Sequence, residues 1–157
     1  MKNQEQQATL RRLDDLYALE KLINIYQEYC DDRNWDGYGS CYTEDAVVVV
    51  KGGTSGPICG RAAIVEMAVQ SFFAHYQVTQ HLITNLNFEL IGADSATGRG
   101  ETILVALAEE RQTPDIYITG GRYRWQFRRT AAGWKFAHYE VGFVWSRGRL
   151  VDGIFAK

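Results

Sequence analysis

The sequence predicts one α+β domain in which helices wrap a strongly curved, mixed or antiparallel sheet and enclose a single pocket. Three observations predict this class. Apolar residues in the first third recur at helical spacing, and residues in the second half alternate with a period of two. Gly120-Gly121 interrupts one expected long strand, and interior glycines commonly mark a bend. At 157 residues the chain has the length of one domain, which we expect to span residues 1–157.

Three helices are expected in the first half of the chain. The first covers residues 10–31, after a flexible tail at residues 1–9, and its apolar residues form one stripe. These are Leu16, Leu19, Leu22, Ile23, Tyr26 and Cys30. The polar residues 31–34 end it, because short polar side chains compete for backbone hydrogen bonds. A short helix follows from Trp35 to about Tyr42, and a third runs from Gly60 to about Ala74.

Strands are expected at residues 46–50 and then throughout the second half. The β-branched run 46–50 is too short and stiff for a helix, and glycine and proline turns close it. A long strand begins at Val78, and strict alternation places two sets on opposite faces. One set is Leu82, Thr84, Leu86, Phe88 and Leu90; the other is His81, Ile83, Asn85 and Asn87. Strands at about 97–109, at 114–128 and from the turn at 130–133 through Trp145 complete a meander.

Composition and spacing exclude several classes of function. The formal charge of −2 gives no basic surface for nucleic acid or an anionic membrane. Cys30, Cys41 and Cys59 cannot all pair and contain no CxxC motif, and no apolar run reaches the roughly 18 residues of a membrane span. We therefore expect a cytoplasmic protein. The three histidines lack metal-ligand spacing, and no glycine-rich phosphate loop is present, so we expect neither metal nor organic cofactor.

Four ordered segments carry a resemblance to a known family. They are residues 23–36 (INIYQEYCDDRNWD), 42–47 (YTEDAV), 81–85 (HLITN) and 121–136 (GRYRWQFRRTAAGWKF). In this order and spacing they resemble the SnoaL-like branch of the nuclear transport factor two-like superfamily, which includes dehydratases and a dehydrochlorinase. The resemblance implies an α+β barrel with a conical pocket for a small hydrophobic molecule. It also implies a homodimer or higher homo-oligomer, often formed through the outer face of the sheet.

The same resemblance implies a catalytic pair, Asp31 at the end of the first helix and His81 on the first long strand. A carboxylate that fixes one imidazole nitrogen makes the other a directed general base. Taken alone, such residues are more often a helix cap and a structural histidine. Asp32 is the competing carboxylate and ranks lower, because Tyr26 to Asp31 keeps the family's five-residue step. Tyr26, in the buried stripe, is expected to polarise a substrate oxygen, or else to be a core aromatic.

Residues expected to line the pocket come from several elements. They are Tyr42, Phe72, Thr102, Leu104, Tyr123, Trp125 and Tyr139. Leu104 stands where some relatives carry a second acid or base. His138 or Tyr139 replaces an arginine of the dehydrochlorinase-like pattern, or neither reaches the pocket. The arginines at 122, 124, 128 and 129 are most simply a solvated or dimer-facing side of a strand, although one of them is a candidate to bind an acidic group.

These residues favour a cofactor-independent lyase or isomerase that acts on a small hydrophobic cyclic substrate. Elimination, as in dehydration or dehydrohalogenation, is the first choice within that class. The alternatives are a non-catalytic ligand-binding or accessory subunit of the same fold, and a polyketide or terpenoid cyclase that uses the same acid and base. A separation of Asp31 and His81 well beyond about 3.2 Å would favour binding over catalysis.

Overall fold

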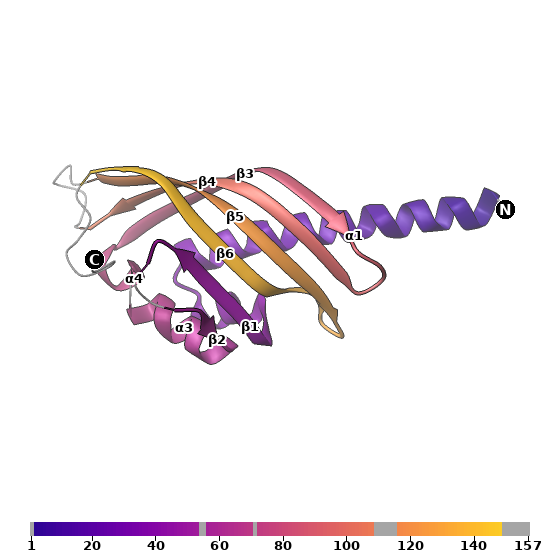
Figure 1. The fold of residues 1–157 in the computed structure, drawn as a ribbon, viewed down its shortest axis with the longest axis horizontal. Helices are drawn as coiled ribbons and strands as arrows, with labels where there is room; N and C mark the ends of the chain where they lie inside the picture. Colours follow the sequence, from indigo (N-terminus) through magenta and orange to yellow (C-terminus); the bar gives the residue numbers. More distant parts are fainter. Residues whose placement is uncertain (1, 54–55, 71, 109–115, 149–157) are drawn as a thin grey trace.

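The computed structural model describes residues 2–53, 56–70, 72–108 and 116–148, and of Phe72 only the backbone. Four helices and six strands follow one another in the described chain (Figure 1). They are α1 (Lys2–Asp31), α2 (Trp35–Ser40), β1 (Tyr42–Lys51), β2 (Ile58–Cys59), α3 (Arg61–Gln70), α4 (Phe72–His75), β3 (Val78–Leu90), β4 (Ser95–Leu107), β5 (Ile116–Thr130) and β6 (Gly133–Arg147).

The sheet has the order β2-β1-β6-β5-β4-β3. All neighbouring pairs are antiparallel except β1 and β6, which are parallel, so the sheet is mixed. The predicted α+β class with a curved sheet and N-terminal helices is confirmed. The expectation of a barrel is corrected, because β2 and β3 are two free edges and the sheet of the described chain stays open. Closure would require these edges to pair.

Helix α1 packs its second half against the inner face of the sheet. Leu19, Ile23 and Cys30 are fully buried there, at the spacing that the sequence predicts. Its first half extends beyond the sheet (Figure 1). Residues 2–9, where we expected a flexible tail, form the first turns of this helix and are exposed.

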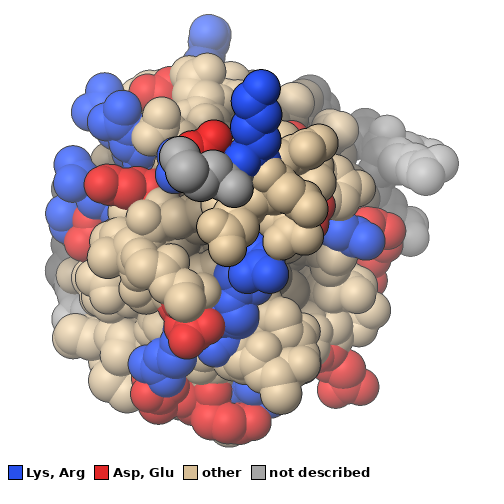
Figure 2. Space-filling model, turned by 90° about the vertical axis from the view of Figure 1, so that its right-hand side faces the viewer, with Lys and Arg blue, Asp and Glu red and all other residues tan. Residues whose placement is uncertain are grey.

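The end of the molecule from which α1 projects carries positive and negative side chains interspersed with uncharged ones (Figure 2). Mixed charge of this kind suits a solvated surface rather than a site for a large polyanion. No helix of the described chain is long and apolar enough to cross a membrane.

The inner face of the sheet holds an aromatic core. Tyr42, Phe136, Trp125 and Phe127 are at most 2% exposed. Their rings and those of neighbouring tyrosines contact one another at centroid distances of 5.2–6.4 Å, the range in which offset and edge-to-face pairs are favourable. The interior between α1 and the sheet is therefore filled largely by aromatic side chains.

Strand β3 departs from strict alternation. Its register with β4 shifts between Thr84 and Asn87, and Asn85 has a φ of 54°, a left-handed conformation that asparagine tolerates better than most residues. The predicted grouping of Leu82 with Leu86, Phe88 and Leu90 is consequently wrong: Leu82 is 44% exposed, whereas the other three pack against the core.

Other boundaries differ by a few residues. The expected third helix divides into α3 and α4, and β1 begins four residues before the β-branched run. The expected bend at Gly120-Gly121 coincides with a register shift against β6. There the ring of Trp145 covers Gly120 so closely that a Cβ on this glycine would clash with the indole Nε1. Glu109 and Pro114, the expected limits of two strands, lie outside the described residues.

Candidate active site

Asp31 and His81 meet where α1 ends beside β3. The His81 Nδ1 lies 2.6 Å from Asp31 Oδ1, and the His81 backbone N–H donates to Asp31 Oδ2 at 2.9 Å. The carboxylate therefore contacts one histidine through both of its oxygens. With Asp31 ionised, Nδ1 carries the hydrogen and Nε2 is left as the free, basic nitrogen. The side chain of His81 is only 4% exposed and that of Asp31 22%.

The Asp31 carboxylate is held in its charged form. Burial alone would raise the pKa of Asp31, but hydrogen bonds from the His81 ring, the His81 amide and the Thr79 hydroxyl outweigh it and hold that pKa below its usual value of 3.8. Thr79 donates to Oδ1 at 3.0 Å. An ionised carboxylate that accepts three hydrogen bonds is well suited to hold an imidazole ring in one orientation.

Arg33 stabilises the contact between Asp31 and His81 through hydrogen bonds to residues on either side of it in the fold. Its guanidinium donates to Thr79 Oγ1, to the Tyr76 carbonyl and to the Cys30 carbonyl, each at 2.7 Å. These bonds connect the end of α1 to the start of β3. Since Thr79 accepts from Arg33 and donates to Asp31, the hydroxyl has one orientation and the carboxylate a fixed position.

A left-handed backbone makes this reach possible. Arg33 has a φ of 58°, which turns the chain back after α1. The guanidinium also stands over the Phe73 ring, 5.0 Å from its centroid, and that ring lies 5.9 Å from the His81 ring. Arg33 and Thr79 were not expected from the sequence. An arginine two residues after the end of a helix gives no signal of a left-handed turn, and only the contacts of Arg33 and Thr79 identify them.

A group of tyrosine hydroxyls lies deeper inside the fold. The Tyr26 and Tyr139 hydroxyls are 2.8 Å apart, and the Tyr42 hydroxyl donates to that of Tyr38 at 3.1 Å. All four are at most 5% exposed. Burial raises the pKa of Tyr26 well above 10, so its phenol stays protonated at neutral pH and can act as a hydrogen-bond donor. Burial also raises the pKa of Tyr123, beside Tyr139, to about 12.

The expected pocket residues that the structure describes all face this interior. Thr102, Leu104, Tyr123 and Trp125 lie on the inner face of β4 and β5, at most 5% exposed, with Leu104 directly paired to His81. The Phe72 side chain lies outside the described residues. Of the two alternatives on β6, Tyr139 points inward.

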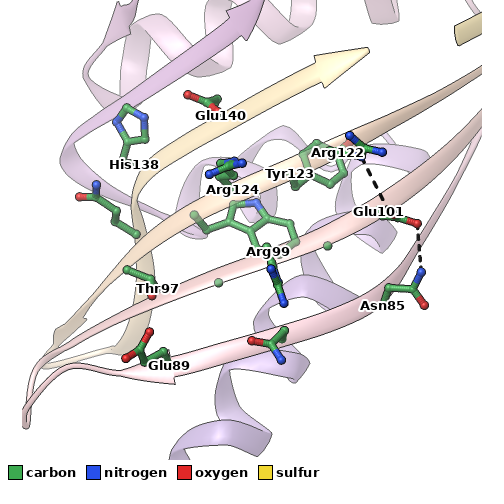
Figure 3. Close-up of a pocket in the computed structure, with 15 residues that line it drawn as sticks. Asn85, Glu89, Thr97, Arg99, Glu101, Arg122, Tyr123, Arg124, His138 and Glu140 are labelled. Atoms are coloured by element: carbon green, nitrogen blue, oxygen red, sulfur yellow. Dashed lines mark hydrogen bonds and ion pairs between the residues drawn. The ribbon is translucent and has the colours of Figure 1, made fainter. Parts of the chain in front are cut away.

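The hollow that the structure describes lies on the other face of the sheet. It is a groove of about 870 Å³ over β3, β4, β5 and β6 (Figure 3). Neither Asp31, His81 nor Tyr26 lines it, and Tyr123 and Trp125 are the only expected pocket residues that do. His138 and the arginines 122 and 124 line this outer groove, so they do not share a site with His81. The pair lies instead on the inner side of the sheet, where the His81 side chain is 4% exposed.

Within the described ranges, no group of three or more His, Cys, Asp or Glu residues is placed to hold a metal ion.

Comparison with known proteins places the chain in a family. The model of the SnoaL-like domain matches residues 11–140. No curated protein matches the sequence. Among solved structures, a candidate scytalone dehydratase from Novosphingobium aromaticivorans is 18% identical with a TM-score of 0.80, over 91% of this chain and 93% of its own. A candidate aromatic ring hydroxylase from the same organism is 27% identical with a TM-score of 0.77, over 87% and 94%. The type 3 hexachlorocyclohexane dehydrochlorinase from Novosphingobium barchaimii is 22% identical with a TM-score of 0.77, over 95% and 98%.

Proposed function

Because the chain belongs to the SnoaL-like domain family, we propose that it is a cofactor-independent lyase or isomerase acting on a small, largely apolar cyclic molecule. One observation carries the proposal: the 2.6 Å contact that orients His81 against an ionised Asp31 within an aromatic interior. This distance is well inside the limit that separates an oriented base from two unrelated side chains. An apolar wall with one polar corner suits a hydrophobic substrate that presents a single acidic C–H.

The proposed reaction is an elimination. His81 Nε2 removes a proton from a carbon next to the leaving group, and the C–H electron pair becomes the new double bond. The leaving group, hydroxide or halide, departs with its bonding electrons. A departing hydroxide takes up the proton that the imidazolium releases and leaves as water, whereas a halide leaves as the anion and the imidazolium releases its proton to solvent. Asp31 keeps its negative charge and stabilises the imidazolium that forms. In an isomerisation the same nitrogen returns the proton to another carbon.

Tyr26 is the proposed electrophilic donor. Its phenol is protonated, and the Tyr139 hydroxyl at 2.8 Å fixes its orientation. A neutral donor in a dry interior stabilises developing negative charge on a substrate oxygen more strongly than one in water. Tyr139 is in this proposal a positioning residue for Tyr26.

Substrate access requires a covering side chain to move, because the His81 side chain is 4% exposed. Phe73 is the half-buried ring that contacts both His81 and Arg33. We therefore assign to Phe73 the role of the side chain that yields when a substrate enters. Phe73→Ala should lower KM more than it changes kcat, if the cost of moving the ring is part of binding.

The names of two structural neighbours suggest the first substrates to test, which are hexachlorocyclohexane and scytalone. Chloride release reports the first reaction and the absorbance of the dehydrated product the second. For whichever compound is converted, His81→Ala and Asp31→Asn should lower kcat/KM by at least about a thousandfold. The matched control is His138→Ala, which removes an imidazole from the outer face. If His81→Ala turns over as fast as the wild type, the assignment is wrong.

A non-catalytic ligand-binding or accessory protein is the second candidate, and the near-complete burial of His81 favours it. In that case Asp31 and His81 form a structural hydrogen-bonded pair. A ligand then binds equally well to wild type and His81→Gln, and neither protein converts any compound with an acidic C–H beside a leaving group.

A further inference from the structure

The outer groove is lined mostly by polar side chains from β3, β4, β5 and β6, which lie side by side across the sheet. On β4 and β5, Arg99 and Arg124 are direct register partners, with side chains on the same face. Cβ atoms of such partners lie about 5 Å apart, and like charges in this position repel each other. Figure 3 shows the two guanidinium groups turned away from each other. An anion that accepted hydrogen bonds from both guanidinium groups would offset the repulsion between them.

The carboxylates near this pair are engaged by other residues. Glu101 accepts from Asn85 at 3.0 Å and lies 3.9 Å from Arg122. Glu140, the register partner of Arg124, instead pairs with Lys51 at 2.8 Å.

Within the residues that the structure describes, no hydrogen bond or ion pair is found for the side chain of Arg99 or Arg124, and Glu89 at the rim does not reach them. These two are the uncommitted cations of the groove. Its volume of about 870 Å³ is within the range of small-molecule sites.

The geometry points to Arg99 and Arg124 as a binding site for the oxyanion group, carboxylate or phosphate, of a small molecule lying in the outer groove. Guanidinium groups offer planar pairs of donors that match both kinds of oxyanion, and one anion between two arginines relieves their repulsion. Gln126 and Thr97 in the adjacent row can bind polar groups on the rest of the ligand. The site lies on the opposite face of the sheet from His81 and is independent of the proposed elimination.

Calorimetric titration of the purified protein, in whatever oligomeric state it adopts, tests the site. The probes are inorganic phosphate and succinate at constant ionic strength, with sodium chloride as the compensating salt. We expect saturable binding of one anion per chain, and the tighter of the two probes identifies the preferred group. Arg99→Gln and Arg124→Gln should each weaken it at least tenfold. Arg147→Gln removes the same charge from an exposed position on the sheet outside the groove and should leave binding unchanged.

Backbone amide shifts provide a second measurement. Both probes should move the signals of residues 97–101 in the wild type, and His81→Ala should leave this response intact. The inference is overturned if neither probe gives saturable binding, as when a second copy seals the groove. It is also overturned if Arg147→Gln weakens binding as much as the two groove variants, because the effect would then be general charge screening.

Discussion

Replacement of Arg33 tests whether its hydrogen bonds stabilise the turn that positions Asp31. Arg33→Ala removes three bonds of 2.7 Å, to Cys30, Tyr76 and Thr79. At about 1 kcal/mol net for each partly buried bond, the free energy of unfolding should fall by about 3 kcal/mol. For a chain of this length the loss corresponds to a Tm lower by about 9 °C.

Arg33→Gly provides the discriminating comparison. It loses the same bonds, but glycine avoids the cost of about 1–2 kcal/mol that alanine pays at a φ of 58°. The greater entropy of glycine in the unfolded chain reverses about half of this gain. Arg33→Gly should therefore be more stable than Arg33→Ala by about 0.5–1 kcal/mol, although it has the smaller side chain.

Urea denaturation followed by tryptophan fluorescence measures both variants, with equal m-values as the check that the unfolded states are comparable. The control is Asn85→Gly at the other left-handed non-glycine position, which should change stability by less than about 0.5 kcal/mol, because Asn85 is exposed. A stabilising role of the Arg33 hydrogen bonds is refuted if Arg33→Ala loses under about 1 kcal/mol, and the backbone explanation is refuted if Arg33→Gly proves the less stable of the two.

Three further changes test other parts of the structure. Asp31→Asn should make the free energy of unfolding less dependent on pH at acid pH, as measured by urea melts at stepped pH. The folded pKa of Asp31 lies below its unfolded value, so the stability that its charge contributes is complete above about pH 5 and is lost as pH falls through the folded pKa. The variant has no carboxylate to protonate and should not show this loss. Gly98→Ala should cost about 1–3 kcal/mol in calorimetry, because the new Cβ would lie 2.8 Å from Phe88 and 2.9 Å from Phe127. Ile103→Glu should convert into monomers, in sedimentation runs, a homodimer that we expect through the apolar end of the outer face outside the groove, since Ile103 is 45% exposed beside Leu82 and Trp145 and none of the three lines the groove; a wild type that sediments as a monomer would contradict this.

The sequence predicts the elements well where one physical pattern dominates. The stripe through Leu19, Ile23 and Cys30 identifies α1, because only helical spacing buries all three. The irregularity at Gly120-Gly121 is predictable because interior glycines in a strand commonly mark a bulge or a bend, and the register with β6 shifts at this position. Spacing within the family motif also leads to the contact of Asp31 with His81, although the roles of these residues in a reaction stay a prediction.

Features that depend on long-range contacts cannot be predicted from the periodicity of the sequence. The outer groove depends on which rows of side chains four strands bring together, and the division between an interior site and an exterior one depends on register. Thr79 belongs to the site because its hydroxyl lies between Arg33 and Asp31, a relation across 48 residues of sequence. A threonine in a strand is otherwise an ordinary residue.

The bulge at Asn85 shows why simple alternation fails for this fold. His81 and Phe88 are separated by seven residues, so a regular strand would place them on opposite faces. Both must face inward, His81 to meet Asp31 and Phe88 to pack beside Phe127 at 5.9 Å. One irregular step at Asn85 reconciles the two demands. The same strand thereby supports the candidate site at one end and the aromatic core at the other, and the cost of the irregularity falls on an exposed asparagine that tolerates a left-handed backbone.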